Sequence, residues 1–284
     1  MMEYTTLNNG VIMPMEGFGV MEISNNDDGE AVILEALHTG YRMIDTASAY
    51  FNEEIVGKAV KKSGIHREDL FITSKLWVQD AGYERTKKAF LETLRKLGTD
   101  YLDMYMVHVP FGDYYGSWRA MEEFCREGRV RALGVCNFYP ARLADLCMNA
   151  DIVPAVCQVE MHPFFQQKEE METMKRFHVQ PEAWSPLAHG RFQIFSHPLL
   201  SAIGARYGKT AGQTALRWNL QRGAAVIPKA ASREHMKENF QIWDFSLTEE
   251  EMKRISTLDK GRTEVEDPTA AESAISANQW KIHE

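Results

Sequence analysis

The chain has 284 residues and a formal net charge of −8, from 32 Lys and Arg against 40 Asp and Glu. Hydrophobic residues make up 44% and charged residues 25%, which indicates a folded globular protein and excludes bulk disorder. The negative balance argues against nucleic acid or an anionic membrane as the partner, while a local basic site for a phosphorylated small molecule stays compatible with it. The length suits two modest domains or one α/β barrel of about 250 residues.

No apolar run is long enough to span a membrane, and the polar N-terminus shows no secretory leader. The cysteines lack a C-x-x-C spacing, and the sequence has no H-E-x-x-H motif. We therefore expect a cytoplasmic protein with free thiols, no disulfide and no metal site. These thiols are Cys125, Cys136, Cys147 and Cys157.

The predicted elements alternate between strand and helix after an N-terminal hairpin. Asn8-Asn9-Gly10 predicts the hairpin turn, between Tyr4–Leu7 and Val11–Met13. Strand-like runs then recur along the chain as β-branched and apolar segments. They are Met15–Gly19, Tyr41–Asp45, Leu70–Lys75, Leu102–His108, Ala132–Cys136, Ala155–Glu160, Gln180–Trp184 and Ala224–Ile227.

Helical windows separate these runs. In Tyr83–Leu97, apolar residues recur at steps of three and four, and Gly98 follows as a helix stop. The alternation predicts one (β/α)8 barrel domain over residues 1–284, with an open doubly wound sheet as the alternative. An extra helix over Thr248–Leu258 and an irregular tail over Gly261–Glu284 are expected to follow. The other helical windows are Gly29–His38, Glu53–Lys62, Ser117–Glu127, Pro140–Asn149, Lys168–Phe177, Ala211–Arg222 and Ser232–Phe240.

Polar or ionisable residues stand where nearly every predicted strand ends, the edge at which such barrels place their chemistry. Asp45, Lys75 and His108 form the set of most interest, with Tyr50 in the short loop after Asp45. A Lys paired with a carboxylate lowers the pKa of a nearby Tyr and makes it a usable general acid. Structural salt bridges and a packing tyrosine are the alternative interpretation.

Two other motifs concern a dinucleotide. Gly17-Phe18-Gly19 lacks the third glycine and the helix start of a Rossmann fingerprint, so we exclude that site. Ile227-Pro228-Lys229 leads into a helix start with further cations, which is typical of an anion site. A solvated basic helix start explains the same residues equally well.

Long motifs in the sequence resemble the signatures of the aldo-keto reductases, in particular the bacterial branch with diketogluconate and glyoxal reductases. The resemblance covers roughly residues 4–260. The matching segments are 40–57, which contains GYRMIDTA, 97–108 (LGTDYLDMYMVH), 134–138 (GVCNF), 158–163 (QVEMHP), 184–187 (WSPL) and 227–240.

This resemblance implies a (β/α)8 barrel that reduces aldehydes or ketones with NADPH, NADH also being possible. It implies that Tyr50 donates the proton, that Lys75 held by Asp45 lowers the pKa of Tyr50, and that His108 orients the carbonyl. A non-catalytic nicotinamide-binding barrel with a regulatory or structural role is the alternative. The implied cofactor-binding residues are Gly19, Val20, Met21, Asp45, Cys136, Asn137, Gln158, Trp184, Ser185, Leu187, Lys229, Ser232, His235, Glu238 and Asn239. The implied substrate-binding residues are Met21, Tyr50, Trp77, His108 and Val109.

The sequence departs from the family pattern at several of these positions. Met21 and Val109 stand where the family often has an aromatic residue and Trp, so we expect a roomier pocket with Trp77 as a wall. His235 stands where the family usually has Arg, and His is only partly charged at neutral pH. We expect a weakened NADPH preference in a monomer that binds a small carbonyl compound. Other departures are Cys136 for Ser, Cys157 for Asn, Trp184 for Tyr and Ala230 for Ser or Thr.

Overall fold

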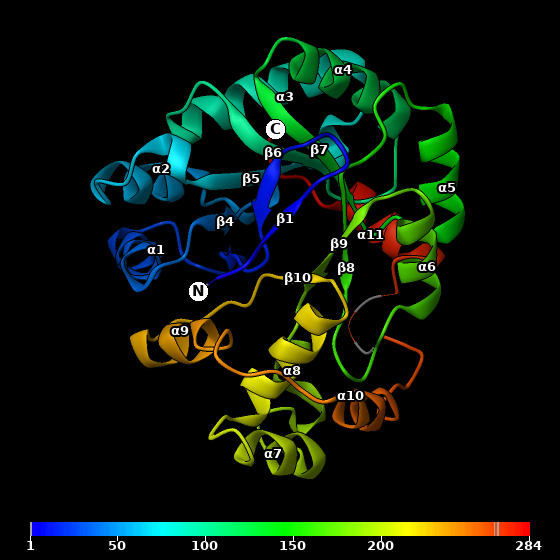
Figure 1. Cartoon of the computed structure of the whole chain (residues 1–284). Helices are drawn as coiled ribbons and strands as arrows, with labels where there is room; N and C mark the ends of the chain where they lie inside the picture. The colour runs from blue at the N-terminus through cyan, green and yellow to red at the C-terminus, as the bar shows by residue number, and fades with distance from the viewer. Residues whose placement is uncertain (1, 264, 266) are drawn as a thin grey trace.

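The computed structural model describes residues 2–263, 265 and 267–284. Eight parallel strands form one curled sheet in sequence order, and helices cover its outer side (Figure 1). The carboxyl ends of the strands therefore meet at one end of the sheet. The strands are β3 (Phe18–Gly19), β4 (Met43–Asp45), β5 (Phe71–Leu76), β6 (Leu102–Val107), β7 (Val130–Cys136), β8 (Val156–Glu160), β9 (Gln180–Trp184) and β10 (Ala225–Val226).

The first and last strands meet at a seam that closes the barrel. Glu16 and Val226 form a parallel bridge there. The Val226 amide donates to Met15 O at 3.0 Å, and the Gly17 amide donates to Val226 O at 2.9 Å. The predicted (β/α)8 fold is confirmed, and the open doubly wound sheet is wrong.

The crossover helices follow the predicted windows closely. In α3 (Tyr83–Leu97), Gly98 ends the helix in a left-handed conformation with φ 63°, as its sequence predicts. Phe90 of this helix packs against Tyr105 of β6 and stacks on Phe124 of the next helix. The other predicted helices are α1 (Asp27–Thr39), α2 (Glu53–Lys62), α4 (Tyr114–Arg126), α5 (Pro140–Asn149), α6 (Lys168–Arg176), α8 (Ala211–Gln221), α9 (Arg233–Phe240) and α10 (Glu249–Ser256).

The N-terminal hairpin of β1 (Tyr4–Thr6) and β2 (Ile12–Pro14) caps the amino-terminal end of the barrel. Its turn residue Asn8 donates to Pro154 O at 2.9 Å, just before β8. Asn9 donates to Arg131 O at 3.0 Å, at the start of β7. The hairpin therefore lies at the end opposite the predicted site.

Three sequence predictions differ from the structure. The tail predicted to be irregular contains a helix, α11 (Ala271–Gln279), which packs beside the loop after β5. A further helix, α7 (Pro198–Ala205), was not predicted. The first predicted strand, Met15–Gly19, is shorter in the structure and comprises only β3. Residues 15–17 form hydrogen bonds with Val226 of β10 instead. No helix within the described ranges is long and apolar enough to cross a membrane.

Candidate active site

Most of the ionisable residues predicted at the strand ends lie at the same level of the barrel. The register pairs Gly19 with Asp45, Cys136 with Gln158, and Glu160 with Trp184 on neighbouring strands. Because parallel strands present their carboxyl ends at one edge, these strand ends surround a common opening, which we call the mouth of the barrel.

Lys75 is the centre of this cluster. Its side chain is fully buried and forms an ion pair with Asp45. Its Nζ also donates to Thr46 O at 3.0 Å and to the Tyr50 hydroxyl at 3.3 Å. Burial lowers the pKa of Lys75, but the charge of Asp45, together with Tyr50, Cys136 and the hydrogen bond to Asp45, outweighs burial and keeps the pKa above its usual value. The ammonium is therefore a permanent positive charge beside Tyr50.

Tyr50 ends a short 3₁₀ turn, η1 (Ser48–Tyr50), which the surrounding loops hold against β5. Ser48 Oγ donates to Lys75 O at 2.9 Å. Thr46 Oγ1 donates to Asn52 Oδ1 at 2.8 Å, and Asn52 Nδ2 donates to Val20 O at 2.7 Å. The position of Tyr50 is thus fixed through backbone carbonyls of the two neighbouring strands.

The expected low pKa of Tyr50 is wrong for this structure. Lys75 does lower it, as predicted, but burial outweighs that effect, and the pKa of Tyr50 rises to about 12. Tyr50 is therefore a neutral phenol at neutral pH, which is the protonation state of a proton donor.

His108 stands next to Tyr50 at the mouth. Its ring is 5.5 Å from the Tyr50 ring and 5.3 Å from the Trp77 ring, edge-on in both cases. Nδ1 of His108 is buried and has no hydrogen-bond partner among the described residues. Burial, then the charge of Lys75, lowers the pKa of His108 well below its usual value, so the imidazole is neutral. A neutral imidazole carries one ring N–H, which can donate to a polar atom of a ligand.

Gln158 connects this cluster to a buried acid that the sequence analysis did not single out. Its Nε2 donates to Asp45 Oδ2 at 3.0 Å and to Glu182 Oε1 at 2.5 Å. Burial, reinforced by Asp45, raises the pKa of Glu182 to about 7. Glu182 points inward, two residues before Trp184, so strand alternation was the signal that could have found it. Cys136 Sγ lies 3.8 Å from Gln158 Oε1, as a buried thiol in the same layer.

Asn137 and Trp184 form a second polar pair at the mouth. Asn137 takes a left-handed backbone with φ 61°, and its Nδ2 donates to His108 O at 3.3 Å. Trp184 Nε1 donates to Asn137 Oδ1 at 3.0 Å, and the Trp184 side chain is half-buried. The half-exposed indole offers a flat surface for a planar ring.

The remaining predicted cofactor residues lie apart from the Lys75 cluster. Ser185, with φ 47°, contacts His189 Nε2 through its hydroxyl at 2.5 Å. Beyond them, Leu187 begins a loop in which Ala188, His189, Phe192 and Gln193 all have positive φ. Non-glycine residues seldom adopt this conformation, so the loop is strained, as binding segments often are.

The predicted anion site at the start of α9 has the capping geometry that its sequence suggests. Ser232 accepts from the His235 amide at 3.2 Å as the N-cap residue. Lys229 is paired with Glu22, which the sequence analysis did not single out, at 2.6 Å. Glu238 accepts from Thr210 Oγ1 at 2.7 Å, and Asn239 is buried.

The predicted substrate residues differ in how they are placed at the mouth of the barrel. Trp77 and Val109 belong to one apolar cluster that also includes Ala277 and Ile282 of the tail. Met21 is 45% exposed in the loop after β3. Trp77 lies beside His108, and the substrate-binding roles of Trp77, Met21 and Val109 stay predictions.

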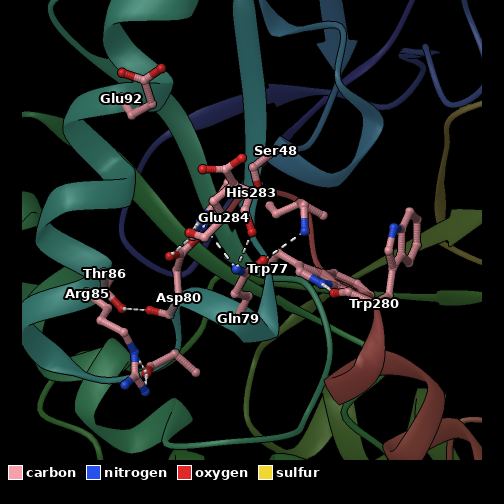
Figure 2. A network of polar contacts seen from close by, with 12 residues as sticks. Ser48, Trp77, Gln79, Asp80, Arg85, Thr86, Glu92, Trp280, His283 and Glu284 are labelled. Atoms are coloured by element: carbon pink, nitrogen blue, oxygen red, sulfur yellow. Dashed lines mark hydrogen bonds and ion pairs between the residues drawn. The ribbon is translucent and has the colours of Figure 1, made fainter.

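The C-terminal tail reaches the mouth, which no sequence pattern indicated. Trp77 Nε1 donates to Trp280 O at 3.0 Å, and the two indoles meet edge-on with centroids 5.0 Å apart. Further along, the Ile282 amide donates to Gln79 at 2.7 Å, and His283 contacts Asp80 at 2.9 Å (Figure 2). The start of the tail is also fixed, because Thr263 Oγ1 donates to Glu160 Oε2 at 2.5 Å.

Comparisons with known proteins agree with this geometry. A family model described as the aldo/keto reductase family matches residues 17–260. Glyoxal reductase of Bacillus subtilis (strain 168) is 44% identical over 255 residues, which is 89% of this chain and 92% of that protein. Methylglyoxal reductase DkgA of Escherichia coli (strain K12) is 42% identical over 265 residues, which is 92% of this chain and 95% of that protein.

A solved structure shares both the fold and part of the sequence. The aldo-keto reductase of Bombyx mori in complex with NADP superimposes with a TM-score of 0.87 at 29% identity, covering 92% of this chain and 94% of that one. The family model matches most of the length, and the closed barrel agrees with it. The chain belongs to the aldo/keto reductase family.

Proposed function

We propose that the chain reduces small aldehydes and ketones to alcohols with NADPH, and that Tyr50 is the proton donor. The observation that carries the proposal is the buried Lys75–Asp45 ion pair, with the Tyr50 hydroxyl 3.3 Å from Lys75 Nζ and a neutral His108 beside it. A purely structural barrel has no need of a desolvated cation aimed at a phenol at the mouth.

The residues at the mouth fit a nicotinamide dinucleotide. Trp184 offers a half-exposed indole face, and Asn137 and Gln158 offer amide groups in the same layer. At the seam, a Cβ on Gly19 would lie 2.9 Å from Ile227 O, so glycine permits the close approach of two loops beside the predicted phosphate site. We assign the nicotinamide end to Cys136, Asn137, Gln158 and Trp184, the middle to Gly19, Val20, Met21, Ser185 and Leu187, and the 2′-phosphate end to Lys229, Ser232, His235, Glu238 and Asn239.

In the mechanism, the bound nicotinamide supplies the hydride, and the chain supplies the proton and the position of the carbonyl. A ring N–H of His108 donates to the carbonyl oxygen and holds it next to Tyr50. Tyr50 donates its phenolic proton to that oxygen. Lys75 lies 3.3 Å from the phenol oxygen and stabilises the phenolate that the transfer leaves. Asp45 keeps Lys75 charged in a fully buried position.

The proposed substrates are small carbonyl compounds such as 2-oxoaldehydes. Relatives named glyoxal reductase and methylglyoxal reductase, together with the Trp77 wall and the tail beside it, support this class. We also propose a cytoplasmic location, which the four free cysteines support, and a monomeric state.

The test is oxidation of NADPH with methylglyoxal, a nitrobenzaldehyde and a panel of keto sugars, by the parent and by Tyr50→Phe. Phe keeps the ring and removes only the proton donor, so kcat should fall by about 10²–10⁴-fold while NADP⁺ binding stays nearly unchanged. Tyr105→Phe is the matched control, because its ring packs on Phe90 on the outer side of the barrel. A Tyr50→Phe variant within threefold of the parent in kcat would exclude Tyr50 as the acid, and a parent that binds NADPH tightly without turnover would favour the regulatory role.

A further inference from the structure

An ion pair joins the two ends of the barrel sheet above the predicted phosphate site. Glu22 lies in the turn after β3 with a left-handed backbone, φ 62°, and Lys229 follows β10. Their Oε2 and Nζ atoms are 2.6 Å apart, although the residues are 207 positions apart in the sequence. The pair therefore crosses the seam of the barrel.

The backbone beneath the pair holds these two loops together. The Gly19 amide donates to Pro228 O at 3.2 Å, and no side chain separates Gly19 from Ile227. Because the loops are in backbone contact, Glu22 and Lys229 stay within reach of one another. The pairing is thus a consequence of how the barrel closes rather than of two long side chains meeting by chance.

Cations at the start of α9 are largely neutralised by carboxylates. Lys229 is paired with Glu22, and Arg233 is paired with Glu35 at 2.7 Å. Glu234 adds a further negative charge in the first turn of the helix. A dianionic phosphate arriving at Ser232 would meet a site with little net positive charge and would compete with Glu22 for Lys229.

The Glu22–Lys229 pair can be displaced. Both side chains reach solvent, with 65% of Glu22 and 40% of Lys229 exposed, and ion pairs of this kind are weak. Glu22 therefore competes with an incoming phosphate without blocking it. A nucleotide that carries a 2′-hydroxyl in place of the phosphate would leave the pair intact.

We propose that Glu22 is a specificity-determining residue that reduces the preference for NADP(H) over NAD(H) by competing for Lys229. This inference rests on the proposed function, because it takes Lys229 as a ligand of the 2′-phosphate. It adds a second cause, besides His235, for a weakened phosphate preference. Each cofactor with a 2′-phosphate must break the pair to bind, and each cofactor without it does not.

The test is the dissociation constant of NADP⁺ and of NAD⁺ for the full chain, measured by calorimetry at low and at physiological salt. Glu22→Gln should tighten NADP⁺ binding by about three- to tenfold and change NAD⁺ binding by less than about twofold. The gain should shrink at higher salt, because exposed charges are screened. Adding Lys229→Met to Glu22→Gln should abolish the gain.

Two control variants separate the possible outcomes. Asp151→Asn removes the same charge from another surface ion pair, with Arg126 at 2.8 Å, and should leave both constants unchanged. Lys229→Met should weaken NADP⁺ alone. If it does so while Glu22→Gln leaves the NADP⁺ to NAD⁺ ratio unchanged, the inference about Glu22 fails and the phosphate site stands. If Lys229→Met leaves NADP⁺ binding unchanged, the phosphate site itself is misplaced, and equal gains for both nucleotides in Glu22→Gln would show a general charge effect.

Discussion

The seam of the barrel contains a buried acid whose protonation should control stability. Glu16 has no exposed surface and accepts from Trp243 Nε1 at 2.8 Å through one carboxyl oxygen. The other oxygen has no hydrogen-bond partner among the described residues. Burial outweighs the Trp243 bond and raises the pKa of Glu16 from 4.5 to about 8. At neutral pH the folded protein therefore holds this carboxyl as a neutral acid.

The direction of the pH effect follows from this raised pKa. The folded state binds a proton that the unfolded state has lost, so Glu16 costs no stability below its unfolded pKa of 4.5 and progressively more as pH rises to about 8. A shift from 4.5 to about 8 corresponds to about 5 kcal/mol over that range. Glu16→Gln stays neutral at every pH and keeps an oxygen that can accept from Trp243. The variant should exceed the parent by less than about 1 kcal/mol at pH 5 and by about 4–5 kcal/mol at pH 8.

Urea unfolding of the parent and of Glu16→Gln at pH 5, 6.5 and 8 measures this difference. Glu250→Gln removes an exposed carboxylate in the first turn of α10 and is the control, which should show no comparable gain at pH 8. A Glu16→Gln difference that is the same at all three pH values would refute the buried neutral acid. So would a variant that is less stable than the parent at pH 8.

Two further predictions concern the mouth of the barrel. Replacing Met21 or Val109 with Trp should lower kcat/KM for a bulky ketone by about tenfold and that for methylglyoxal by less than about threefold, because overpacking penalises the larger ligand. Equal losses on both substrates would show that these side chains do not line the substrate site. The hydrogen bond to Asp80 raises the pKa of His283, so their pairing is complete below the usual His range and is lost as pH rises through the raised value. Amide hydrogen exchange across residues 271–284, corrected for intrinsic rates, should therefore accelerate as pH rises in the parent. In His283→Asn the same amides should exchange fast at every pH. If exchange in the parent does not change with pH, another contact holds the tail.

Much of the fold and of the catalytic set can be predicted from the sequence. Apolar runs alternate with helical windows, and Gly98 marks a helix end. These signals depend only on residues close in sequence, and the structure has the same elements. Asp45, Lys75 and His108 all lie at or next to the carboxyl ends of their strands, so parallel pairing alone predicts that they meet. The pKa of Tyr50 could not be predicted from these neighbours, because the cost of burial depends on the side chains of the whole mouth.

The features that the sequence did not reveal depend on contacts between distant segments. The helix α11 buries little more than Ser273 and Ala277, so no strong apolar stripe indicates it. The pairing of Glu22 with Lys229 follows from closure of the barrel, which brings together residues 207 positions apart. Such pairs are set by topology, and their members look like ordinary surface charges along the chain.

The two ends of the described chain lie at opposite ends of the barrel, and this decides where other polypeptide can be attached. Residues joined ahead of the hairpin would leave from the amino-terminal end, where Asn8 and Asn9 contact the starts of strands. Residues joined after Glu284 would leave from the loop after β5, where Trp280 and His283 contact Trp77 and Asp80. A purification tag or fusion partner at the carboxyl end would thus crowd the proposed catalytic site, whereas the same tag at the amino end would lie at the opposite end of the barrel.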